Sequence, residues 1–118
     1  MNPKLAWLLV FATIAGLSAG QMLFKIGALR LERDGAPTAI PFLNVPIVVA
    51  LLIYVISTMF WISALRVLPL RLAYPVSALA FVVVPVLGHY FLDEPISVRS
   101  LVGAIIIVAG IAVATSGG

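Results

Sequence analysis

Four long apolar runs, each about 20 residues in length, constrain this chain more than any other feature. Residues 5–24 and 46–65 contain no charged side chain, residues 72–92 contain only His89 as an ionisable group, and residues 97–116 are charged only at Arg99. An α-helix rises about 1.5 Å per residue, so about 20 apolar residues cross a hydrocarbon core of ~30 Å. The sequence therefore predicts an all-α membrane protein with four transmembrane helices.

The composition agrees with this prediction. Hydrophobic residues make up 64% of the chain and charged residues 9%, whereas a soluble domain has about 25% charged residues. We expect one four-helix transmembrane domain over residues 1–118, with helices at about 5–31, 46–65, 70–92 and 97–116. The first run is longer than the apolar part of a signal peptide, which has about 7–15 residues, so we expect it to be retained.

Several kinds of chemistry are excluded or disfavoured. The chain has no cysteine and a single histidine, His89, which argues against disulfides, thiol catalysis and a zinc site. We expect no enzyme activity, no metal and no cofactor. The net charge of +3 does not indicate nucleic-acid binding, because the basic residues are scattered and lie mostly near helix ends.

Prolines and short connections suggest how the helices are arranged. Pro46 suits the first turn of the second helix, and Ser97 is a suitable N-cap for the fourth. The first helix is expected to end near residue 31, before an Asp34–Gly35 turn. The connection over residues 66–71 is short, so we expect the second and third helices to be antiparallel neighbours.

A kink is expected in the third helix. Pro75 lies near the start of this helix, where proline is tolerated, but Pro85 lies in its interior. Proline lacks the N–H that would bond to the carbonyl of Phe81, four residues earlier. The sequence therefore predicts a kink at Pro85.

The basic residues leave the orientation open. With four spans, one side of the membrane carries Lys4, Arg66 and Arg71, and the other carries Lys25, Arg30, Arg33 and Arg99. Because three against four gives almost no bias under the positive-inside rule, either both orientations are made, as an antiparallel dimer needs, or a few specific charges or a partner decide the orientation.

Polar and aromatic residues recur with helical spacing on three of the four helices. The three stripes are Ser18, Gln21 and Lys25; Tyr54, Ser57 and Trp61, with Thr58 beside them; and Tyr74, Ser77 and Phe81. Lipid offers no hydrogen-bond partner, so such stripes are expected to face inward. They are typical either of a shared polar cavity or of ordinary helix–helix contacts and membrane-interface aromatics.

The charged residues limit the possible cargo. Glu32, Asp34, Asp93 and Glu94 all fall in the predicted connections, so no carboxylate lies within a predicted span. A proton-coupled exporter of organic cations needs a buried acid that attracts the cation and exchanges protons. The sequence therefore disfavours this mechanism.

Individual charges allow more than one role. Lys25 suits either an anchor for an anionic group, such as a lipid phosphate, or a lysine that reaches the headgroups. Glu94 suits the helix dipole, a pair with Lys25 or Arg99, or a substrate amine. Arg66 and Arg71 suit headgroup contact, or a share in phosphate binding.

The fourth helix differs from the other three. Small residues, Gly103, Gly110 and Ala114, fall on one ridge, and branched apolar residues fill much of the remainder. Small residues let membrane helices approach closely. This helix is therefore predicted to pack against another helix or to form a dimer.

Motifs in three parts of the chain carry a family resemblance. In order, they are Ala19-Gly20-Gln21 with Lys25; Leu68-Pro69, Ala73-Tyr74-Pro75, Ser77 and Phe81-Val82; and Glu94-Pro95-Ile96-Ser97, Arg99, Gly103 and Ala109-Gly110-Ile111. Together they resemble the small four-helix members of the drug/metabolite transporter superfamily, which includes EamA-like and small multidrug resistance proteins. The strongest resemblance is to the small subunits of the aminoarabinose–undecaprenyl phosphate flippase.

This resemblance implies a small multidrug resistance-like bundle in the bacterial inner membrane that moves a lipid-linked sugar. Small multidrug resistance transporters carry a glutamate in the first helix, and the matching position here is Leu17, which argues against drug/proton antiport. The partner implied is a second copy or a paralogous four-helix subunit. The residues assigned to the substrate are Gln21, Lys25, Tyr54, Trp61, Arg66, Arg71, Tyr74, Ser77 and Glu94.

Two alternatives remain open. An exporter of small molecules or metabolites would take up organic cations in response to a pH gradient. A membrane scaffold that transports nothing would tolerate changes in the polar stripes but not at Gly103 and Gly110.

Overall fold

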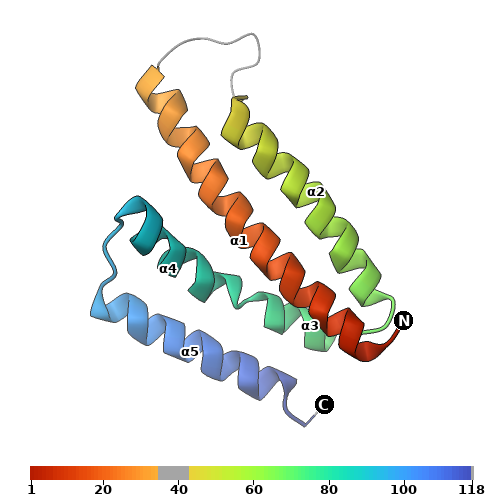
Figure 1. Ribbon diagram of the computed structural model, residues 1–118. Coiled ribbons are helices and arrows are strands. Elements are labelled where there is room, and N and C mark those ends of the chain that lie inside the picture. Colours follow the sequence, from red (N-terminus) through yellow and green to blue (C-terminus); the bar gives the residue numbers. More distant parts are fainter. Residues whose placement is uncertain (35–42, 118) are drawn as a thin grey trace.

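The computed structural model describes residues 1–34 and 43–117, which form helices and no strand (Figure 1). The helices of the described part are α1 (Pro3–Asp34), α2 (Val45–Leu65), α3 (Leu70–Ser77), α4 (Ala80–Leu92) and α5 (Val98–Thr115). α3 and α4 together form one span, Leu70–Leu92, so residues 1–34 and 43–117 contain four helical segments long and apolar enough to cross a membrane. The predicted class, an all-α multi-pass membrane protein, is confirmed.

α1 is longer than the sequence predicts. It runs to Asp34, so Glu32 and Asp34 lie in its last turn. The prediction that these two acids lie in a connection is therefore wrong. Its 32 residues exceed the roughly 20 that a bilayer needs, so part of the helix projects beyond the hydrocarbon core. The predicted turn at Asp34–Gly35 falls partly outside the described residues.

Two predicted helix starts are confirmed. Pro46 lies in the first turn of α2, whose N-cap is Asn44. The Asn44 side chain accepts a bond from the N–H of Ile47 and donates one to the carbonyl of Gly27 on α1, so it joins the two helices. Ser97 caps α5, where its hydroxyl accepts a bond from the N–H of Ser100 at 3.1 Å.

The third span is broken, but the break does not lie at Pro85. α4 is continuous through Pro85, and the helix is interrupted at Ala78–Leu79. Here the amide N–H groups bond three residues back, as in Leu79 to Val76 and Phe81 to Ala78. The Pro85 ring crowds the carbonyl of Phe81, but Phe81 lies inside α4, after the break, so the direct effect of Pro85 does not explain where the helix is interrupted.

α2 and the third span come together only at their connected ends and do not pack along their lengths, contrary to the prediction from their short connection. α1 packs most extensively against α2, and α3 and α4 each pack against α1 and α5. The short connection holds only the ends of α2 and α3 together. Packing on α1 decides where the rest of each helix lies, and a cavity separates α2 from the third span.

The tightest packing lies at the end of the molecule where α2 connects to α3. Buried apolar residues of α1, α2, α3 and their connection form one cluster: Ala6, Val10, Ile14, Ala64, Leu68, Ala73 and Val76. Away from this core the helices spread into a flat array (Figure 1), with principal dimensions of 52 × 37 × 17 Å. A helix with its side chains is about 10–12 Å wide, so much of the chain is only one to two helices thick.

α5 packs against α3 and α4 but buries no residue of its own. The buried share of the spans falls from 33% in α1 to 0% in α5. A β-carbon built on Gly103 or Gly110 would meet no atom within 4 Å. The small-residue ridge of α5 is therefore not used for packing by the described part of this chain.

Candidate functional site

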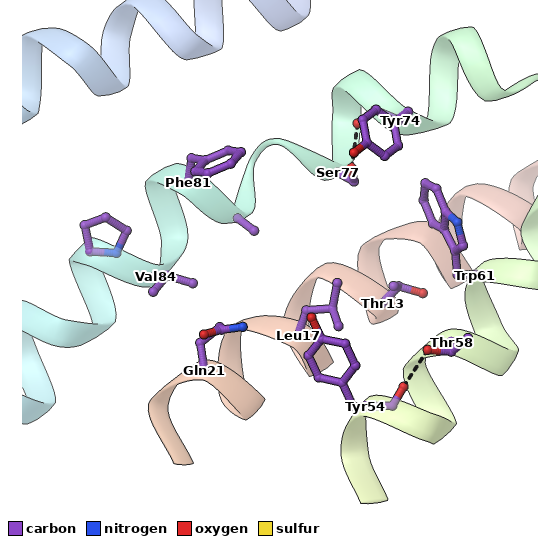
Figure 2. A pocket seen from close by; sticks show the side chains of 12 residues that line it. Thr13, Leu17, Gln21, Tyr54, Thr58, Trp61, Tyr74, Ser77, Phe81 and Val84 are labelled. Carbon is purple, nitrogen blue, oxygen red and sulfur yellow. Dashed lines mark hydrogen bonds between the residues drawn. The ribbon is translucent and has the colours of Figure 1, made fainter. Parts of the chain in front are cut away.

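A cavity of about 630 Å³ lies between α1, α2 and the third span (Figure 2). Its size is in the range of ligand pockets in proteins, roughly 300–1,000 Å³. Its lining residues are uncharged: Thr13, Leu17, Gln21, Tyr54, Thr58, Trp61, Tyr74, Ser77, Ala80, Phe81, Val84 and Pro85. Five of the residues that the sequence assigns to the substrate are among them, namely Gln21, Tyr54, Trp61, Tyr74 and Ser77.

On α1 the cavity face is Thr13, Leu17 and Gln21, which are spaced four residues apart. Ser18, predicted to share a stripe with Gln21, is buried elsewhere and donates its hydroxyl to the carbonyl of Ile14. The prediction missed Thr13, although extending the Gln21 face by two turns would have found it.

On α2 the cavity face is Tyr54, Thr58 and Trp61. Ser57, which the sequence places in the same stripe, points instead to α1. Its hydroxyl lies where a β-carbon on Gly16 would be, and its carbonyl accepts a bond from Thr13 at 3.3 Å. Ser57 and Ser18 are thus helix-packing residues, whereas the aromatic members of the α2 stripe line the cavity.

The third span contributes Tyr74 and Ser77 from α3 and four residues from α4. The break at Ala78–Leu79 lies between these two groups. Figure 2 shows Tyr74, Ser77, Phe81 and Val84 on the span that faces Trp61 and Leu17. Ala80, Val84 and Pro85 were missed by the sequence prediction, because their positions depend on where the helix breaks.

The hydroxyl groups of the cavity donate their protons to the backbone. Thr13 donates to Leu9, Thr58 to Tyr54 and Ser77 to Tyr74. Two of these bonds are drawn in Figure 2. A hydroxyl whose proton is used in this way still has oxygen lone pairs, so Thr58 and Ser77 can accept a bond from a ligand, whereas Thr13 is only 3% exposed. The Gln21 amide and the Trp61 indole add donors, and the cavity therefore offers both hydrogen-bond donors and hydrogen-bond acceptors.

Lys25 and Glu94 form an ion pair outside the cavity, with Nζ and Oε2 3.9 Å apart. Of the pairings that the sequence left open for Glu94, the structure has the one with Lys25. Lys25 lies one turn after Gln21 on α1, and Glu94 lies in the connection between α4 and α5. The pair therefore lies at one end of the cavity.

The arginines assigned to the substrate lie elsewhere. Arg66 is the C-cap of α2 and is exposed in the α2–α3 connection. Arg71 borders a separate shallow depression with Leu70, Tyr74 and Pro75. Tyr74 is common to this depression and to the cavity, so the arginine end is opposite the Lys25 end.

The sequence of residues 4–116 matches the EamA-like transporter family over nearly its whole length. The chain belongs to this family. Leu17 lines the cavity between Thr13 and Gln21 on α1, so this part of the cavity wall is apolar.

Proteins similar to this chain include probable flippase subunits. The chain is 31% identical to the probable 4-amino-4-deoxy-L-arabinose-phosphoundecaprenol flippase subunit ArnF of Pseudomonas syringae, over 94% of this chain and 83% of that protein. It is 38% identical to the ArnE subunit of Proteus mirabilis over 45% of this chain. An uncharacterised protein of Sinorhizobium fredii, y4nH, is 30% identical over 94% of this chain and 95% of its own length.

The matches to ArnE proteins are partial. The matched segment covers 47% of the length of the Proteus mirabilis ArnE and 55% of the length of the ArnE of Photorhabdus laumondii, so the chain spans about half of these relatives. No solved structure matches the chain.

Proposed function

We propose that this chain is a transporter subunit that moves a polyprenyl-phosphate-linked amino sugar across the bacterial inner membrane. The observation that carries the proposal is an uncharged cavity, lined by aromatic rings and hydrogen-bonding groups, with a lysine beyond one end. The names of the ArnE and ArnF relatives support the substrate class. Because moving a lipid between leaflets breaks no covalent bond, the function needs no catalytic group.

The cavity suits the sugar part of such a lipid. The rings of Tyr54, Trp61 and Tyr74 offer apolar faces for the C–H groups of a sugar, and the aromatic N–H and O–H groups give polar contacts. Sugar hydroxyls both donate and accept, as do the groups around the cavity. The polyprenyl tail would remain in lipid, to which the apolar outer surface of the helices is suited.

Lys25 is the proposed phosphate anchor at one end of the cavity. Its ammonium group is a compact cation with three donors, and the Gln21 amide lies one turn away on the cavity side. Arg66 and Arg71 would meet the phosphate at the opposite end, after the headgroup has crossed. A lysine at one end of the cavity and arginines at the other end fit a substrate that carries one anionic group.

A second subunit is proposed to complete the transport path. The 17 Å dimension leaves little protein to cover the cavity on both faces of the array. The exposed ridge of Gly103, Gly110 and Ala114 on α5 suits close contact with another helix. The partner would be a second copy or a paralogous four-helix chain.

Lipid flipping in proteoliposomes tests the proposal. A short-chain polyprenyl phosphate with an amino sugar is incorporated into both leaflets, and a membrane-impermeant amine reagent is added outside. We expect the protein to expose the inner-leaflet lipid to the reagent. Uptake of quaternary ammonium dyes driven by a pH gradient, without lipid flipping, would overturn the proposal.

Matched tyrosine variants connect this activity to the cavity. Tyr74 lines the cavity and is 67% exposed, whereas Tyr90, on the same span, is 73% exposed and does not line it. We expect Tyr74→Ala to slow flipping at least about tenfold through loss of a stacking and hydrogen-bonding contact. Tyr90→Ala should keep the wild-type rate, and equal loss in both variants would contradict the assignment of the cavity.

A further inference from the structure

The backbone fixes Glu94 at the end of α4. Asp93 ends the helix in the left-handed conformation, with φ of 53°. The next amide N–H, that of Glu94, bonds to the carbonyl of Gly88 at 3.2 Å. The carbonyl of Glu94 lies 2.8 Å from Nδ1 of His89, which donates to it. The start of the Glu94 side chain is therefore held against the last turns of α4.

Gly88 makes room for the carboxylate. A β-carbon on Gly88 would lie 2.6 Å from Oε1 of Glu94, closer than such atoms approach one another. Gly88 is also buried, the one such residue within α4. Because it has no side chain, the carboxylate lies over the helix and points toward Lys25 on α1.

The ion pair between Lys25 and Glu94 is open to exchange. The two side chains are 49% and 51% exposed, and the separation of 3.9 Å is well beyond the roughly 2.7–2.9 Å of a charge-assisted hydrogen bond. Each charged group therefore keeps room for a closer partner. A ligand can replace the other member of the pair without breaking a short bond.

The pair also lies in line with the cavity. On α1 the cavity residues Thr13, Leu17 and Gln21 continue at the same four-residue spacing to Lys25. On α4 the lining ends at Pro85, one turn before Gly88. Four residues of helix rise about 6 Å, which places the two charges beside the end of the space proposed to hold the sugar.

We infer that Lys25 and Glu94 exchange their ion pair for the two charges of the ligand, so that Glu94 selects headgroups that carry an amine as well as an anion. This inference rests on the proposed function. The phosphate takes Lys25, and the amine of the sugar takes Glu94. A ligand with a phosphate but no amine leaves Glu94 without a cation and must compete with Glu94 for Lys25.

Two lipid probes that differ in one group test this selection. One is a short-chain polyprenyl phosphate with an amino pentose, and the other has a hydroxyl in place of the amine. Binding to the purified full chain in nanodiscs is followed by tryptophan fluorescence, since Trp61 lines the cavity. We expect the wild type to prefer the amino lipid about tenfold, which is the order of one charge-assisted hydrogen bond.

Glu94→Gln should reduce this preference to about one, because it removes the partner of the amine and releases Lys25. Asp93→Asn is the matched control, since this acid is adjacent in the chain and is not part of the pair; it should keep the preference. A Glu94→Gln protein that retains the tenfold preference would overturn the inference.

Gly88→Ala tests the role of the Glu94 carboxylate without changing Glu94 itself. The added methyl meets only the mobile end of the Glu94 side chain, so it should displace the carboxylate without unfolding the helix. We expect thermal stability close to the wild-type value and a preference reduced as in Glu94→Gln. An unchanged preference would count against the role of Glu94.

A charge reversal separates ligand recognition from a merely structural pair. Lys25→Glu combined with Glu94→Lys restores attraction between the two positions but places a carboxylate beside Gln21. We expect wild-type thermal stability and loss of binding of both lipids. Restored binding would show that only the link between α1 and the α4–α5 connection matters, and would overturn the inference.

The outcomes for the wild type separate the two proposals. If the wild type binds both lipids equally, the inference about Glu94 fails and the flippase proposal stands. If it binds neither lipid, both fail together.

Discussion

Small residues lie on ridges of both α1 and α5, yet the structure uses them differently. On α1, Gly16, Gly20 and Gly27 face α2, and a β-carbon on Gly16 or Gly27 would collide with Ser57 or Ile47. On α5, a β-carbon on Gly103 or Gly110 would meet nothing. The small residues of α1 pack against α2 of the same chain, whereas those of α5 are free to contact lipid or another subunit.

This difference shows that the pattern alone does not identify the partner of a membrane helix. Lipid is as apolar as the helix surface, so helices associate through close packing and hydrogen bonds. The α1–α2 contact has both, because Asn44 donates to the carbonyl of Gly27 at 2.9 Å. α5 buries no residue, so its close-packing surface is available to the proposed second subunit.

The strongest destabilisation is expected on the α1 ridge, which packs against α2. Gly27→Leu places a side chain in the space of Ile47 and the Asn44 cap, and we expect it to destabilise the folded chain by about 2 kcal/mol or more through overpacking. Denaturation in mixed detergent micelles, followed by circular dichroism, measures the change.

Gly110→Leu is the matched control on α5. Because this position faces open space, we expect the stability of the single chain to stay within about 0.5 kcal/mol of the wild type, while association with the second subunit in nanodiscs is lost. Equal destabilisation by both leucines would contradict the contrast between the ridges.

A smaller effect is expected at the helix caps. Asn44 is half-buried and bonds to both α1 and α2, whereas the Ser97 hydroxyl is exposed and bonds only within its own helix start. We expect Asn44→Ala to cost about 1–2 kcal/mol and Ser97→Ala about 0.5–1 kcal/mol. The same denaturation experiment gives the ranking, and a reversed order would place the stronger cap on α5.

The smallest effect on stability is expected where the α4–α5 connection meets α1. Both members of the Lys25–Glu94 pair are about half exposed, and such pairs contribute about 0–1 kcal/mol. Glu94→Gln should therefore change the free energy of unfolding by less than about 1 kcal/mol. A loss as large as that of Gly27→Leu would mean that the pair holds the fold together.

Features that depend on neighbouring residues in the chain could be predicted from the amino-acid sequence. Four apolar runs required four spans, because unpaired backbone groups are too costly in lipid. Pro46 and Ser97 marked helix starts, because an N-terminal turn needs no proline N–H and favours a hydroxyl cap. Helical spacing also grouped Gln21, Tyr54 and Tyr74 with helix faces that line the cavity.

Which of the residues on these faces line the cavity and which pack against another helix became clear only from the folded arrangement. Ser18 and Ser57 share helical stripes with cavity residues, but a rotation of a helix by less than one residue decides where each side chain points. The separation of α2 from the third span and the position of the break before Pro85 depend on packing against α1. The approach of Glu94 to Lys25 likewise depends on contacts between residues far apart in the chain, which no local pattern records.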